Sequence, residues 1–114
     1  MKTSLIGQTA EQLVAEYLLR AGHMVLECNW RQKRCEIDII SRKKGIVYFT
    51  EVKFRSSNFQ GDGMEYITAS KLKQMEYGAA LWSQQNGWRG DCRLMAAAVG
   101  RAEGMMVIKE IIEL

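Results

Sequence analysis

An apolar segment in the middle of the chain, residues 46–50, runs directly into Glu51, Val52 and Lys53 before apolar character returns at Phe54. Such a run is typical of a strand buried on both faces, where an unpaired carboxylate or ammonium group is costly. Because strand side chains alternate, Glu51 and Lys53 point to the same face, about 7 Å apart along the strand. The chain must fold around this charged pair, which is therefore the first candidate for a functional site.

A second strand-like segment upstream, residues 36–40, carries Glu36 and Asp38 on one face. Carboxylates from neighbouring strands can hold a divalent cation, usually Mg²⁺, whose remaining positions are filled by water and phosphate oxygens. Asp38 and Glu51 suit that role, and Lys53 could orient an attacking water or stabilise transition-state charge. A buried salt-bridge cluster that merely satisfies itself is the open alternative.

The 114 residues, 47% hydrophobic and 25% charged, are typical of one globular domain spanning residues 1–114. No stretch is long or apolar enough to cross a membrane, and the N-terminus lacks a signal peptide's apolar core. The three cysteines, Cys28, Cys35 and Cys92, form no Cys-x-x-Cys pair, so reduced thiols in a cytoplasmic protein fit best. A zinc site from these cysteines and His23 matches no common ligand spacing.

The pattern of apolar residues and turns predicts an α/β fold in the order α-β-β-β-α-β-β, with a central mixed sheet flanked by helices. The strand that carries Glu51 and Lys53 is expected to be central. The predicted elements are a helix over 5–21, strands over 24–29, 35–41 and 46–55, a loop over 56–63, a helix from Thr68 to about residue 86, and strands over 93–99 and 105–111.

Positive charge gathers around the acidic positions. Residues 31–55 hold eight basic and three acidic side chains, a net charge of +5, whereas the rest of the chain sums to −2. A polyanion is the natural partner of such a patch, although the basic turns are equally explained as solvated hairpins. The predicted nucleic-acid-binding residues are Arg31, Arg55, Thr68 and Lys71, with Phe59 and Tyr66 able to stack on bases.

Several short motifs, in this order, resemble the YraN family of bacterial proteins over essentially the entire chain. The matching pieces are Gly7 with Glu11, Asn29-x-Arg31, residues 36–40, residues 51–55, Thr68-x-x-Lys71 and Cys92-Arg93. The resemblance implies a restriction-endonuclease-like fold, similar to that of archaeal Holliday-junction resolvases. In those relatives a helix glutamate, a strand aspartate and a Glu-x-Lys pair form the metal site, which by position implies Glu11, Asp38, Glu51 and Lys53 here. It also implies a homodimer.

The sequence departs from the family pattern at two positions, Cys35 in place of a glycine and Met95 in place of an aspartate. The function predicted from site and resemblance is a Mg²⁺- or Mn²⁺-dependent endonuclease acting on DNA, either branched or single-stranded. Asp38, Glu51 and Glu11 are the expected metal ligands, and Lys53 serves the attacking water. The alternatives are a non-catalytic nucleic-acid-binding or assembly module on the same fold and, last, a protein–protein adaptor using the apolar C-terminal strand.

Overall fold

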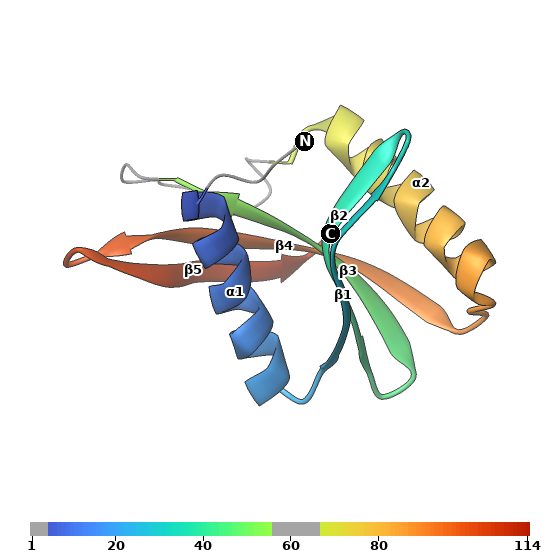
Figure 1. Cartoon of the computed structure of the whole chain (residues 1–114), viewed down its shortest axis with the longest axis horizontal. Helices are drawn as coiled ribbons and strands as arrows, with labels where there is room; N and C mark the ends of the chain where they lie inside the picture. The colour runs from blue at the N-terminus through green and yellow to red at the C-terminus, as the bar shows by residue number, and fades with distance from the viewer. Residues whose placement is uncertain (1–4, 56–66) are drawn as a thin grey trace.

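The computed structural model describes residues 5–55 and 67–114, except the side chain of Leu5 (Figure 1). The predicted order α-β-β-β-α-β-β is confirmed. The elements are α1 (Leu5–Arg20), β1 (Met24–Gln32), β2 (Cys35–Lys43), β3 (Ile46–Phe54), α2 (Ala69–Asn86), β4 (Asp91–Ala102) and β5 (Met105–Glu113). The loop expected over 56–63 lies outside the described residues, and so do the two aromatic residues Phe59 and Tyr66. Neither helix in the described part of the chain is long and apolar enough to cross a membrane.

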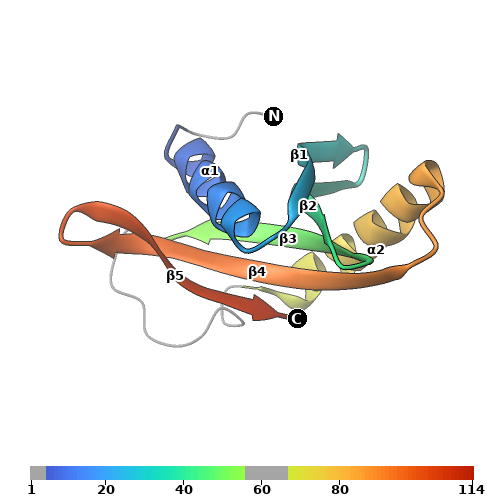
Figure 2. The ribbon, with the colours of Figure 1, turned by 90° about the horizontal axis from the view of Figure 1, so that it is seen from below.

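The five strands form one mixed sheet in the order β1-β2-β3-β4-β5. β3 and β4 are parallel, whereas the other neighbouring strands are antiparallel. α1 lies against one face of the sheet and α2 against the other, and the β1–β2 hairpin bends away from the rest of the sheet (Figure 2). The predicted α/β class is confirmed, and β3, with Glu51 and Lys53, is the central strand.

Apolar side chains fill a core on each face of the sheet. The core under α1 contains Ala10, Val14, Leu18, Ile39, Met95, Ala97 and Val99. The core under α2 contains Trp30, Cys35, Ile37, Ile40, Val47, Phe49, Met75, Ala79 and Trp82. The Trp82 indole N–H also donates a 2.8 Å hydrogen bond to Glu27 of β1, which ties α2 to the hairpin. β2 and β3 are therefore held from both sides.

β2 and β3 separate part of the way along their length. Their ladder runs from the Lys43–Ile46 pair to the Ile39–Thr50 pair and stops there, although β2 begins at Cys35 and β3 continues to Phe54. The two strands thus form a fork, which is visible where β2 and β3 diverge in Figure 1. Asp38 and Glu51 are the first residues beyond the last pair, so they lie at the base of this fork.

β1 is longer than predicted. The sequence suggested an end at Asn29, but the strand continues to Gln32 and keeps its pairing with β2. Asn29 itself adopts the left-handed conformation, with φ of 55°. Asparagine tolerates this conformation better than most residues and is common in turns, which is why the residue looked like a strand end.

Thr50 is fully buried, and its Oγ1 atom has no hydrogen-bond partner within residues 5–55 and 67–114. We expect Thr50→Val to raise the free energy of unfolding by about 1 kcal/mol, because it removes an unsatisfied buried hydroxyl group and keeps the shape of the side chain. The matched control is Ser41→Ala, which removes an equally buried hydroxyl that is 2.9 Å from His23 Nδ1 and should destabilise by a similar amount. Urea unfolding measures both; destabilisation by Thr50→Val would contradict the prediction.

Candidate active site

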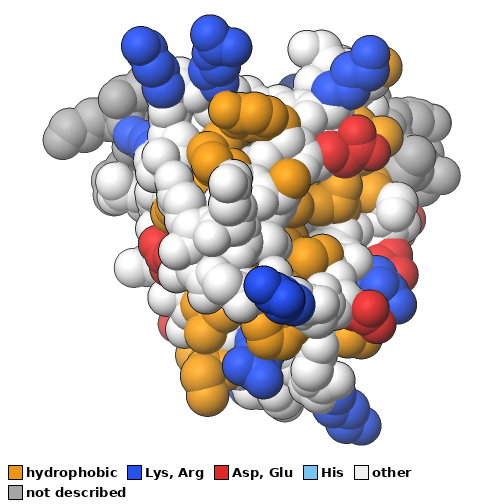
Figure 3. All heavy atoms as spheres, turned by 90° about the vertical axis from the view of Figure 1, so that its right-hand side faces the viewer, with side chains coloured by type: hydrophobic (Ala, Val, Ile, Leu, Met, Phe, Trp, Pro, Cys, Tyr) orange, Lys and Arg blue, Asp and Glu red, His pale blue; other side chains and the backbone are white. Residues whose placement is uncertain are grey.

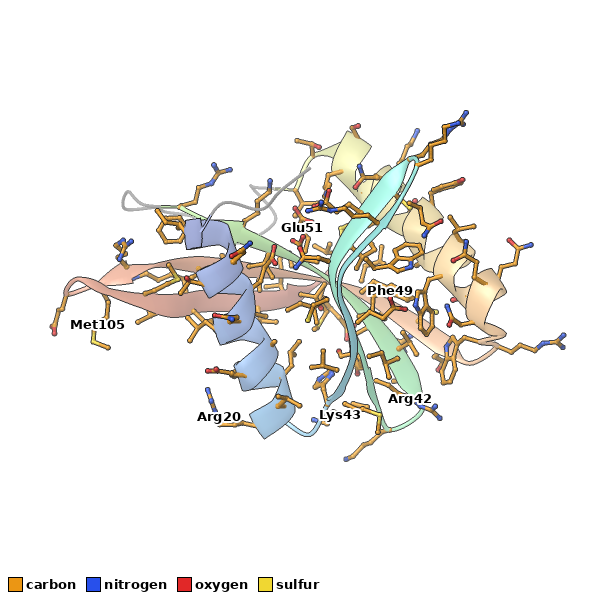
Figure 4. All side chains as sticks on the ribbon, viewed as in Figure 1. Arg20, Arg42, Lys43, Phe49, Glu51 and Met105 are labelled. Carbon is orange, nitrogen blue, oxygen red and sulfur yellow. The ribbon has the colours of Figure 1, made fainter. Side chains whose placement is uncertain are left out.

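Two carboxyl groups meet at the fork. Asp38 of β2 and Glu51 of β3 are each only 5% exposed. The backbone N–H of Val52 donates a 2.8 Å hydrogen bond to Asp38 Oδ2, which fixes this carboxyl group beside the strand that carries Glu51. In Figure 4, Glu51 lies where β2 turns away from β3, between the N-terminal ends of α1 and α2. The structure therefore brings together two of the three residues that were predicted as metal ligands.

Two lysines flank Glu51. Lys71 Nζ, from α2, is 3.3 Å from Glu51 Oε1, and Lys53 Nζ, from β3 itself, is 3.7 Å from Glu51 Oε2. Lys71 also donates a 2.8 Å hydrogen bond to Gln74 Oε1. Its position follows from the start of α2, where Thr68 Oγ1 accepts from the Lys71 N–H as the N-cap. Lys71, predicted as a flanking phosphate ligand, thus lies within the carboxylate cluster.

Glu11 reaches the same region from α1. Its side chain is half-buried and hydrogen-bonds with the side chain of Asn29, and its buried Oε1 atom has no hydrogen-bond partner among the residues that the structure describes. Burial raises the pKa of Glu11, and the negative charges of Glu36 and Glu51 raise it further. The charges of Glu11 and Glu51 therefore interact, and the part of Glu11 in a metal site stays a prediction.

The surroundings of Asp38 favour its protonated form. Burial, together with the negative charge of Glu51, raises the pKa of Asp38 to about 8, and Glu11 adds to the effect. The Val52 N–H and the Lys71 ammonium oppose the rise without cancelling it. A proton thus neutralises the excess negative charge here, and a bound cation could do the same.

The donors at the fork fit a hard cation that keeps part of its water shell. Among residues 5–55 and 67–114, no three His, Cys, Asp or Glu side chains are gathered closely enough to hold an ion by themselves. Mg²⁺ is, however, commonly bound by one or two carboxylates plus water and substrate phosphate. Asp38 and Glu51 supply that pair, and the partnerless Glu11 Oε1 offers a further acceptor nearby.

The other predicted nucleic-acid-binding residues surround this cluster. Arg31 lies 3.8 Å from Glu36, and the exposed Arg55 follows the end of β3. A hollow of about 370 Å³ lies beside Arg31 and is lined by Arg31, Gln32, Lys33, Arg34, Cys35, Glu36 and Gln74. Figure 3 shows Lys and Arg side chains projecting from the upper edge of the α2 side of the molecule. Because Gln74 also bonds Lys71, the basic hollow and the carboxylates are neighbours.

The two departures from the family pattern are apolar side chains of the two cores. Met95 pairs with Thr50 and belongs to the core under α1, on the opposite face from Val47, Phe49 and Glu51. Cys35 is buried in the core under α2. Both replacements are therefore core contacts, and the four predicted site residues are intact.

Sequence reasoning missed the small neighbours of Glu51 and Lys53. In the parallel register these residues pair with Ala96 and Ala98 of β4, whose side chains are single methyl groups. The run of three alanines from residue 96 to 98 was the available signal. β4 thus presents only methyl groups beside the charged pair.

The two lysines should differ in their structural importance. We expect Lys71→Met to lower the free energy of unfolding by about 1–3 kcal/mol, because Glu51 is buried and Lys71 is its nearer and less exposed partner. Lys53→Met should cost less than about 1 kcal/mol, since the Lys53 side chain is 40% exposed. Urea unfolding of both variants at one salt concentration makes the comparison, and a larger loss in Lys53→Met would contradict it.

Fold and site together define an α/β protein with a buried carboxylate pair and two lysines at a fork in its mixed sheet. The model of "Uncharacterised protein family UPF0102" matches residues 10–99, which include Glu11, Asp38, Glu51 and Lys53. A UPF0102 protein of Chlorobium phaeobacteroides is 35% identical over 83% of this chain and 76% of its own length. A UPF0102 protein of Renibacterium salmoninarum is 34% identical over 87% of this chain and 86% of its own length. The chain belongs to the UPF0102 family, which is the YraN family.

Proposed function

We propose that this protein is a divalent-metal-dependent endonuclease that hydrolyses phosphodiester bonds in DNA. The observation that carries the proposal is the pairing of Asp38 with Glu51 at the base of the fork, with Lys53 and Lys71 on Glu51. Buried acidic groups with a strongly raised pKa are uncommon outside functional sites. The order α-β-β-β-α-β-β, the one expected for this site in the resolvase-like relatives, adds support.

Each side chain has a distinct role in this proposal. Asp38 and Glu51 would hold a Mg²⁺ or Mn²⁺ ion, which supplies Lewis-acid polarisation of the attacked phosphate when bound. Lys53 is partly exposed and can orient a water molecule or stabilise charge that develops on the phosphate. Lys71 keeps Glu51 Oε1 in place from α2. Glu11 would assist by accepting a hydrogen bond from a water molecule in the site through its Oε1 atom, which has no such partner among the described residues.

DNA is proposed as the substrate because cations surround the carboxylates. Lys33, Arg34 and Arg31 line the hollow beside the site, and Arg55 is exposed at the end of β3. Such groups bind backbone phosphates with little sequence preference, which suits a nuclease that recognises DNA structure. Branched and single-stranded DNA are the proposed substrates, and a cytoplasmic homodimer is proposed because two sites are needed to cut both strands of a branch.

A non-catalytic nucleic-acid-binding module is the second candidate. It is favoured by one observation: two lysines already neutralise Glu51, so the cluster can satisfy itself without a metal ion. In that case DNA binding would depend on salt, would need no metal and would be unaffected by Asp38→Asn.

Cleavage of end-labelled single-stranded, duplex and four-way-junction DNA in Mg²⁺, Mn²⁺ or EDTA tests the proposal. The nuclease predicts cutting in Mg²⁺ or Mn²⁺ and none in EDTA, with the preferred substrate identifying the recognised DNA structure. Binding that is sensitive to salt but indifferent to metal, with no cutting of any substrate, would contradict the nuclease and favour the module.

A further inference from the structure

Asn29 combines an unusual backbone conformation with a place inside a strand. Its φ of 55° lies in the left-handed region, although β1 continues on both sides of it. A residue other than glycine in this region is held there at a cost, and such residues gather at functional sites. Asn29 is one of three described residues other than glycine with positive φ, and the other two, Lys44 and Glu103, lie in hairpin turns.

The cross-strand neighbour of Asn29 is Asp38. Cys28 pairs with Ile39 and Trp30 pairs with Ile37, so the register sets Asn29 opposite the aspartate at the fork. β2 is twisted at Asp38, opposite Asn29. This follows because Ile37 packs in the core under α2, whereas Ile39 packs in the core under α1. In a regular strand these two side chains would share a face. The left-handed residue thus marks the level at which the hairpin twists and Asp38 lies at the fork.

The side chain of Asn29 reaches Glu11 on α1. It hydrogen-bonds with the Glu11 carboxyl group, and both residues line one hollow of about 320 Å³ with Gln8, Gln12, Ala15 and Cys28. The hydrogen bond leaves Glu11 Oε1 buried without a hydrogen-bond partner. A carboxylate that is fixed by one oxygen and free on the other is prepared to accept a further donor.

We propose that Asn29 is a positioning residue that joins the two halves of the candidate site: its left-handed backbone sets the hairpin at Asp38, and its side chain holds Glu11 toward the metal position. The inference rests on the proposed metal-dependent function. Asparagine suits both tasks, because it tolerates positive φ and carries an amide N–H that can donate to a carboxylate.

Three variants separate the backbone role from the side-chain role. Asn29→Gly keeps the left-handed backbone and removes the amide; Asn29→Ala removes the amide and also strains the backbone. Asn29→Asp keeps the shape but places a carboxylate against Glu11, and adding Glu11→Gln restores a hydrogen-bonded amide–carboxylate pair at the original charge. Melting temperature in EDTA and the dissociation constant for Mn²⁺ are measured for each full-length protein.

Asn29→Gly should melt close to the wild-type temperature in EDTA and bind Mn²⁺ about 10- to 100-fold more weakly, the usual effect of removing a group that orients a metal site. Asn29→Ala should bind Mn²⁺ as weakly as Asn29→Gly, and its melting temperature in EDTA should also be about 5 °C lower. Asn29→Asp should melt lower, and Glu11→Gln should recover that loss. Wild-type affinity in Asn29→Gly, or no recovery in the double variant, would overturn the inference alone. Absence of Mn²⁺ binding by the wild type would overturn the proposed function and, with it, this inference.

Discussion

Asp38→Asn should abolish metal-dependent DNA cleavage, with a loss of at least about 10³-fold, and leave the fold intact. The loss follows because the variant lacks a negative ligand for the cation, which contributes several kcal/mol of transition-state stabilisation. The fold should survive because Asp38 is protonated near neutral pH, and asparagine resembles that neutral form. Its amide oxygen can still accept the hydrogen bond from the Val52 N–H. Cleavage rates and melting temperatures of the two proteins make the measurement.

Glu36→Gln is the matched control for this experiment. Glu36 stands two residues away on the same strand and is half-buried, but its partner is Arg31 on the neighbouring strand. We expect Glu36→Gln to retain cleavage to within about tenfold. Full activity in Asp38→Asn, or equal losses in both variants, would contradict the assignment of Asp38 as a metal ligand.

The metal-free protein should become less stable as pH rises from about 5 to above 8. Burial and the charge of Glu51 raise the pKa of Asp38 in the folded state to about 8, from its ordinary value of 3.8. Its stabilising contribution is therefore complete below pH 3.8, where both states are protonated, and is lost as pH rises through about 8. Between pH 5 and pH 8 this shift corresponds to a loss of about 4 kcal/mol. Urea unfolding in EDTA across this pH range measures it.

Asp38→Asn isolates the contribution of this residue. Glu11, whose pKa is also raised, acts in the same direction, whereas His23 acts in the opposite one because its pKa is lowered. The wild type and Asp38→Asn share Glu11 and His23. Subtracting the free energy of unfolding of Asp38→Asn from that of the wild type at each pH therefore removes the contributions of Glu11 and His23. The difference should fall with rising pH; a flat difference would mean that Asp38 is ionised throughout.

The sequence was sufficient for the element order and for the carboxylates because both depend on local patterns. The apolar run into Glu51 and Lys53 predicted a central strand, and strand alternation alone placed these two side chains on one face. The predicted convergence of Asp38 with Glu51 is confirmed at the fork. Glu11 was predicted as part of the site only from the family resemblance, because a helix glutamate beside an apolar stripe is usually a surface residue.

The rest of the site depends on the paths of the strands in three dimensions. Lys71 reaches Glu51 only because α2 starts beside the fork, and no spacing in the sequence encodes that approach. Asn29 looked like the end of a strand because asparagine favours turns, whereas the strand passes through it in a left-handed conformation. The divergence of β2 from β3 likewise leaves no periodic signal, because residues 37–41 are buried whichever face they take.

The most direct test of the account is a calorimetric titration of the wild-type protein and Asp38→Asn with Mn²⁺, in two pH 7 buffers of different ionisation enthalpy. The account predicts that the wild type binds Mn²⁺ and releases close to one proton per ion, because the cation displaces the proton of Asp38. Asp38→Asn should bind much more weakly and release no proton. Absence of Mn²⁺ binding, or equal binding by the two proteins, would contradict a metal site at the fork and leave a self-satisfied charge cluster in its place.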